Sequence, residues 1–231
     1  MIHTNLQDRK LHWRDFSATR VVASTLGVLL GLGGMEHGFF EMLQGNVTPT
    51  SYIIDAIGPE QELWPGAAEP ALTIIPNFFV TGILAITVGL LVTIYSAVFI
   101  QRKYSARSLF ILSVLLLLVG GGAGPLFSGI LVVILVTRIN KPLLWWRDHL
   151  SVNVRDFLRK TWPWSLITYV TMNLFTVVVT ITGWPFILFF NEIIMIAILY
   201  ILGNIGLVFM VFAILSAFAY DIQNQSDTHL I

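Results

Sequence analysis

The residues best suited to chemistry are ionisable groups inside strongly apolar segments. His37 lies between Glu36 and Glu41 near the end of the first apolar run, and Glu192 lies near the start of the last one. On a helix His37 and Glu41 are neighbours about 40° apart, whereas Glu36 points about 140° from Glu41. Because an imidazole titrates near neutral pH, His37 paired with Glu41 or Glu192 could bind a cation or relay protons.

The composition indicates a membrane protein. Of 231 residues, 56% are hydrophobic and 11% are charged, whereas soluble domains average about 25% charged residues. So few charges could not cover a soluble surface of this size. Ionisable groups within membrane spans are costly and usually mark a site, a pathway or a buried pair.

Hydropathy divides the chain into apolar runs separated by polar connectors. A helix needs about 20 apolar residues to cross the hydrocarbon of a bilayer. We therefore expect an all-α fold, a single transmembrane domain over residues 1–231, with six spans at 21–40, 71–100, 103–121, 122–139, 164–182 and 186–220. A tight turn in the glycine-rich segment 120–125 joins the third span to the fourth.

The distribution of Lys and Arg predicts the orientation, because basic loops are retained in the cytoplasm. All thirteen basic residues lie in three segments, at 9–20, 102–107 and 138–160. The loop 41–70 has none, although it holds five acidic residues. We expect both termini, including the arm 1–20, to be cytoplasmic, the loop 41–70 to be extracytoplasmic, and the membrane to be a plasma (inner) membrane.

Two alternatives to six spans remain open. A single kinked helix over 108–139 would give five spans and would leave one basic segment outside the cell. A break in the last apolar run at Gly203-Asn204 would give seven.

Two connectors have patterns of their own. Residues 142–162 are expected to form an amphipathic helix at the interface, because large apolar side chains recur every three or four residues among basic ones. That helix would be a membrane anchor or, alternatively, a coupling helix that docks a cytoplasmic partner. In the outer loop, 50–58 is expected to form a short helix, because prolines break any longer one.

Two rows of small residues predict close helix packing. Gly27, Gly31, Gly34 and Gly38 fall within about 60° of one another around the first span. In the second span every fourth residue is small or polar, including Thr81, Ala85 and Gly89. Such rows let helices approach closely in a bilayer, so we expect buried interfaces at both.

The six-span topology brings the polar candidates to one depth, in the outer third of the membrane. They are Glu36, His37, Glu41, Asn77 and Glu192. We hypothesise an outward-facing polar pocket between the first, second and last spans. The alternative is that these residues are interfacial and are wetted by lipid headgroups.

Several chemistries are excluded by the residues present. The chain has no Cys, which removes disulfides, thiolate metal sites and cysteine nucleophiles. No second His stands at metal-ligand spacing from His37, and no phosphate-binding or nucleophile-elbow motif occurs, so no metal site and no cofactor are expected. Nucleic-acid binding is not expected, because no basic cluster interleaved with aromatic residues lies on a polar surface.

These features favour a transporter or permease-like subunit whose outer pocket handles a small solute, a cation or protons. The lipid bilayer is the expected partner, with a cytoplasmic or membrane subunit as a second one. One alternative is a non-catalytic scaffold or accessory subunit whose glycine rows bury the helices of a partner. A membrane enzyme that uses His37 with Glu36 or Glu41 on a lipid is a further, less favoured alternative.

Overall fold

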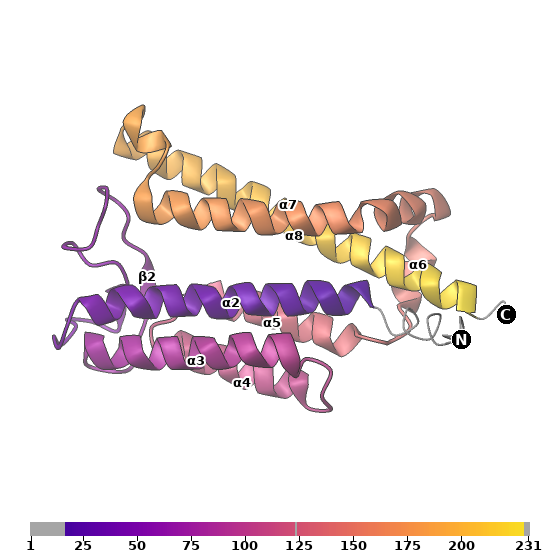
Figure 1. Cartoon of the computed structure of the whole chain (residues 1–231), viewed down its shortest axis with the longest axis horizontal. Helices are drawn as coiled ribbons and strands as arrows, with labels where there is room; N and C mark the ends of the chain where they lie inside the picture. The colour runs from indigo at the N-terminus through magenta and orange to yellow at the C-terminus, as the bar shows by residue number, and fades with distance from the viewer. Residues whose placement is uncertain (1–16, 123, 229–231) are drawn as a thin grey trace, which may run out of the picture.

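The computed structural model describes residues 17–122 and 124–228 as an all-α fold with one small β-hairpin (Figure 1). Its helices are α2 (Ala18–Leu43), α3 (Phe78–Val98), α4 (Ser105–Leu118), α5 (Gly124–Arg138), α6 (Leu144–His149), α7 (Val152–Thr182), the 3₁₀ turn η1 (Phe186–Leu188) and α8 (Glu192–Thr228). Strands β1 (Ile53–Asp55) and β2 (Pro70–Leu72) pair antiparallel. Among the described residues, α2, α3, α7 and α8 are long and apolar enough to cross a membrane, and α4 and α5 are shorter apolar helices.

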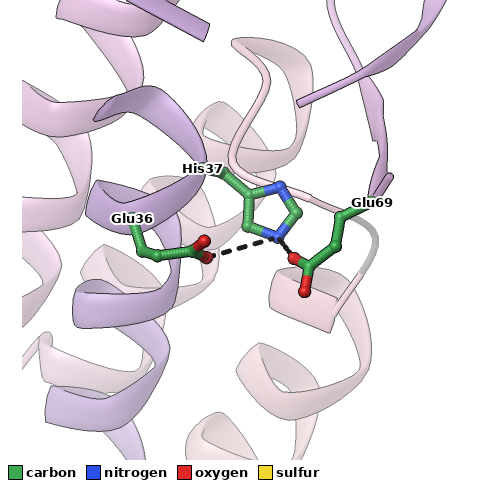
Figure 2. Close-up of side chains that lie close together, drawn as sticks. All are labelled: Glu36, His37 and Glu69. Carbon is green, nitrogen blue, oxygen red and sulfur yellow. Dashed lines mark ion pairs between the residues drawn. The ribbon is translucent and has the colours of Figure 1, made fainter. Parts of the chain in front are cut away.

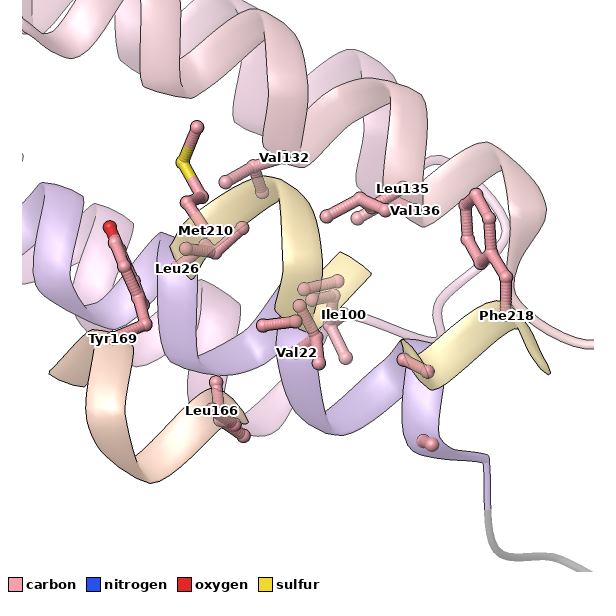
Figure 3. Close-up of a cluster of buried hydrophobic side chains, with 14 of the residues drawn as sticks. Val22, Leu26, Ile100, Val132, Leu135, Val136, Leu166, Tyr169, Met210 and Phe218 are labelled. Atoms are coloured by element: carbon pink, nitrogen blue, oxygen red, sulfur yellow. The ribbon is translucent and has the colours of Figure 1, made fainter. Parts of the chain in front are cut away.

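The helices form two units. α2–α5 make a four-helix bundle, and α7 and α8 make a hairpin along one side of it (Figure 1). The largest apolar cluster joins the units where the start of α2 meets the end of α8, and it includes Val22, Val132, Leu166 and Met210 (Figure 3). Inside a bilayer such a cluster stabilises the fold through close packing, because the surrounding lipid is equally apolar.

A buried carboxylate connects α8 to α2 at the same end of the molecule as this apolar cluster. Asp221 of α8 accepts hydrogen bonds from the Ser17 hydroxyl at 2.8 Å and from the backbone N–H groups of Ala18 at 2.8 Å and Thr19 at 3.0 Å. The first N–H groups of a helix have no partner within the helix, and the helix dipole favours a negative charge there. Asp221 therefore caps α2 from a different helix.

The opposite end of the hairpin is held by the long loop between α2 and α3. Trp64 of this loop is 2% exposed and packs against Val179 of α7 and Met195 of α8. Its indole Nε1 donates a hydrogen bond to the carbonyl of Thr180 at 2.8 Å. The loop thus connects the bundle to the hairpin.

α2 and α3 meet along their rows of small residues. A Cβ atom on Gly31 would lie 2.5 Å from the carbonyl oxygen of Gly89, and one on Gly38 would lie 2.6 Å from that of Gly82. Four further small residues of the two rows are buried as well: Gly27, Gly34, Thr81 and Ala85. These residues of the two rows therefore pack inside the chain.

Two expectations about the connectors are wrong. Residues 142–162 do not form one interfacial helix: Leu150 is extended, Ser151 caps α7, and α7 continues through Pro163 into the span. Residues 50–58 contain strand β1 instead of a helix, with Ile53 opposite Leu72. The β-branched side chains of Ile53 and Ile54 favour a strand, and β2 supplies its partner.

The span boundaries also shift. α3 begins at Phe78, where Asn77 caps it, because residues 70–72 belong to β2. α8 begins at Glu192 and continues without a break through Gly203 and Asn204. The Asn204 amide donates to the Tyr200 carbonyl at 2.7 Å, one turn earlier in the same helix, so this side chain does not interrupt α8.

Candidate functional site

Three ionisable side chains meet near the end of α2. The Nε2 atom of His37 lies 2.7 Å from a carboxylate oxygen of Glu69 and 3.9 Å from one of Glu36 (Figure 2). One donor atom from each residue lies within 4.8 Å of the other two. The side chains are 14% (His37), 21% (Glu36) and 24% (Glu69) exposed, so the group is largely buried but still accessible to solvent.

Sequence reasoning missed Glu69 as a member of this group. It appeared there only as one of five acidic residues in the loop, 32 positions after His37. The hairpin determines its position, because the Glu69 carbonyl accepts a hydrogen bond from Ala56 N–H at 2.8 Å immediately before β2. The available signal was an acidic loop without Lys or Arg beside a span that ends in a histidine.

The glycine-rich segment between α4 and α5 packs against the site. A Cβ atom on Gly122 would lie 2.7 Å from the ring of His37, and one on Gly120 would overlap both carboxyl oxygens of Glu41. These glycines have φ of +84° and +95°, a conformation that other residues rarely adopt. Glycine therefore serves here both for the backbone conformation and for close approach to the ionisable groups.

Strand β2 ties this segment to the loop that carries Glu69. Gly120 N–H donates to the Leu72 carbonyl at 2.9 Å, and Ile74 N–H donates to the Leu118 carbonyl at 2.9 Å. The hydroxyl of Thr81 on α3 donates to the Val119 carbonyl at 2.8 Å. Loop, α3 and the α4–α5 connection consequently form one hydrogen-bonded cover over the end of α2.

Glu41 lies one turn beyond His37 and is fully buried. Neither of its carboxyl oxygens has a hydrogen-bond partner among the described residues. A fully buried carboxyl group without a hydrogen-bond partner is costly in free energy, so Glu41 is an unusual residue at this position.

The other two sequence candidates lie outside this group. The Asn77 side chain accepts from Val80 N–H at 3.0 Å and donates to the Asn46 side chain, so it caps α3. Glu192 is the first residue of α8, and its side chain is exposed. It does not join the group around His37.

An imidazole between two carboxylates can hold a proton or a cation. The absence of a second histidine at ligand spacing predicted no metal site, but the group Glu36, His37 and Glu69 is close enough to hold a metal ion. No family model, curated protein or solved structure matches the chain. The site must therefore be interpreted from its own geometry.

The close contact between Gly120 and Glu41 gives a first prediction. Gly120→Ala should lower the thermal unfolding temperature more than Gly45→Ala. Gly45 has a similar φ of +81° but open space around its Cα, so it carries only the backbone cost, whereas an alanine at 120 also collides with the buried carboxyl group. Thermal unfolding of both variants in detergent is the measurement. Equal decreases would show that the carboxyl group moves aside freely.

Proposed function

We propose that this chain is a transporter or permease-like subunit of a plasma (inner) membrane that handles a cation or protons at the His37 group. The observation that carries the proposal is the meeting of Glu36, His37 and Glu69 at one end of the helices. No Lys or Arg among the described residues forms an ion pair with either carboxylate. The His37 imidazole is therefore the one basic side chain that the described residues place against these two carboxylates.

Six crossings with cytoplasmic termini are part of the proposal. The start of α2, the α3–α4 connection and the region of α6 carry the described basic residues and lie at one end of the molecule, opposite the loop with Glu69 (Figure 1). Retention of basic segments in the cytoplasm makes that end the inner one.

The short helices α4 and α5 are the unusual spans of this topology. They have 14 and 15 residues, which correspond to about 21–23 Å. This is less than the roughly 30 Å of hydrocarbon, so the connecting residues at their ends complete the crossings. The glycine segment then lies at the outer surface, against His37 and Glu41.

The loop offers a mechanical link between the site and the hairpin. Trp64 is anchored to α7 and α8, and Glu69, five residues later, contacts His37 on α2. A displacement of the hairpin relative to the bundle would therefore pull on the Glu69–His37 contact. Transporters that work by alternating access rock one helical unit against another around a binding site.

The test is flux in proteoliposomes. Purified protein is reconstituted with a pH-sensitive dye or a Zn²⁺-sensitive dye inside, and a gradient of protons or of Zn²⁺ is imposed. Wild-type vesicles should respond faster than empty vesicles to at least one ion, and Glu69→Gln and His37→Ala should reduce the response to the empty-vesicle rate. Glu60→Gln is the matched control, because Glu60 is an exposed acid of the same loop.

Two results would contradict the proposal. One is a wild-type protein that moves neither ion, and the other is full flux in correctly folded Glu69→Gln and His37→Ala variants. Folding is checked independently by the thermal unfolding of each variant in detergent.

An accessory subunit is the second candidate, and the outer part of the hairpin favours it. Ile193, Tyr200 and Val208 of α8 are 78%, 71% and 67% exposed. Cβ atoms on Gly203 and Gly206 would meet nothing within 4 Å. This candidate predicts that wild-type vesicles show no flux of their own and that the His37 group affects neither ion.

A further inference from the structure

We infer that Glu36, His37 and Glu69 form a binding site for a divalent transition-metal ion, with Zn²⁺ as the ion that fits best. The inference deepens the proposed function by naming the cation class, and it rests on that function only for its biological role. Its physical basis is the donor set, the spacing of the donors and their charge.

The spacing of the donor atoms suits tetrahedral coordination. Zinc binds His nitrogen and carboxylate oxygen at about 2.0–2.2 Å, which separates neighbouring ligand atoms in a tetrahedron by about 3.3 Å. The His37 Nε2 atom lies 2.7 Å from its Glu69 partner oxygen and 3.9 Å from its Glu36 partner oxygen, on either side of that value. Coordination of an ion would require rotations of the two glutamate side chains that bring both distances close to this value.

The donor types distinguish among ions. Imidazole nitrogen is a ligand of Zn²⁺, Cu²⁺, Fe²⁺ and Ni²⁺, whereas Mg²⁺ and Ca²⁺ prefer oxygen donors alone. Two carboxylates with a neutral imidazole carry a charge of −2, which a divalent ion neutralises. This balance is important at the edge of a bilayer, where an uncompensated charge is costly.

The site has features of reversible binding. Three protein ligands leave a fourth position for water or for an exchanging group, as in zinc sites that are not purely structural. The other ring nitrogen of His37, Nδ1, has no hydrogen-bond partner among the described residues. Histidines that bind metals tightly are usually oriented by such a partner, so we expect an affinity about 10–100-fold weaker than that of a site with one.

The test is a Zn²⁺ titration of the full chain in detergent, where no gradient exists. Binding is followed by competition with a Zn²⁺-sensitive dye and by the visible absorption of Co²⁺ as a substitute ion. Wild type should bind one Zn²⁺ that excess Mg²⁺ does not displace. Glu69→Gln, Glu36→Gln and His37→Ala should each weaken binding by at least about tenfold, and Glu60→Gln should leave it unchanged.

The outcomes separate this inference from the proposed function. Zinc binding in detergent without any flux in vesicles would support the site and contradict the transporter. Proton flux in vesicles without zinc binding in detergent would support the transporter and contradict the zinc site. The inference is overturned by equal Zn²⁺ affinity in wild type and in the folded Glu69→Gln and Glu36→Gln variants, or by displacement of Zn²⁺ by equimolar Mg²⁺.

Discussion

Asp221→Ala is expected to destabilise the folded chain by about 3–5 kcal/mol, because it leaves three buried donors at the start of α2 without an acceptor. These are the Ser17 hydroxyl and the N–H groups of Ala18 and Thr19. The variant also loses a negative charge at the positive end of the helix dipole. The measurement is the free energy of unfolding in mixed micelles, followed by circular dichroism.

Asp148→Ala is the matched control for this experiment. Asp148 lies on α6 with its side chain 64% exposed, and its ion-pair partner is the adjacent Arg147 at 3.5 Å. Exposed pairs of this kind contribute little, so the control should unfold as wild type does. If Asp221→Ala also unfolded as wild type does, the cap between α8 and α2 would not be part of the fold in solution.

Gly31→Leu should have a comparably large effect through the contact between α2 and α3. A side chain at 31 would meet the Gly89 carbonyl oxygen at 2.5 Å and the Thr93 N–H nitrogen at 2.8 Å. Both are backbone atoms, so no rotamer change removes the collision and the helices must separate. Overpacking costs about 1–3 kcal/mol, and the rigid backbone contact favours the upper value. The unfolding temperature should then fall by about 6–12 °C.

The control is Gly33→Leu on the same helix. A Cβ atom at Gly33 would meet nothing within 4 Å, and replacing a helical glycine is favourable by up to about 1 kcal/mol. Its unfolding temperature should match or exceed that of wild type. Equal decreases in the two variants would contradict the close α2–α3 contact.

The polar candidates on α2 show which residues of the site could be predicted from the sequence. Ionisable residues in an apolar span are conspicuous by type alone, and Glu36, His37 and Glu41 could be selected for that reason. Their partner Glu69 could not be selected, because nothing in the sequence distinguishes it from the other acidic residues of the same loop. Asn77 was selected at the correct end of its helix, but the structure uses it as a cap.

Residues 50–58 and 142–162 also have a structure that their local sequence patterns did not predict. Ile53 and Ile54 become a strand because Leu72 and Ala71 of β2 pair with them from 19 and 17 residues away, and no window around 50–58 contains those partners. The segment 142–162 has an amphipathic pattern, yet Ser151 divides it into α6 and the beginning of α7. A periodic pattern predicts a helical face, but it does not determine where one helix ends and the next begins.

The sequence by itself determined the all-α class, the apolar helices α2, α3, α7 and α8, and the separation of basic from acidic connectors. These properties follow from the hydropathy and charge of each segment, which can be read without knowing what the segment contacts. Only the tertiary structure decided that Glu69 joins His37, that Gly120 covers Glu41 and that Asp221 caps α2. Each of these contacts joins residues far apart in sequence, and their distances depend on how the loop, the glycine segment and the hairpin pack together.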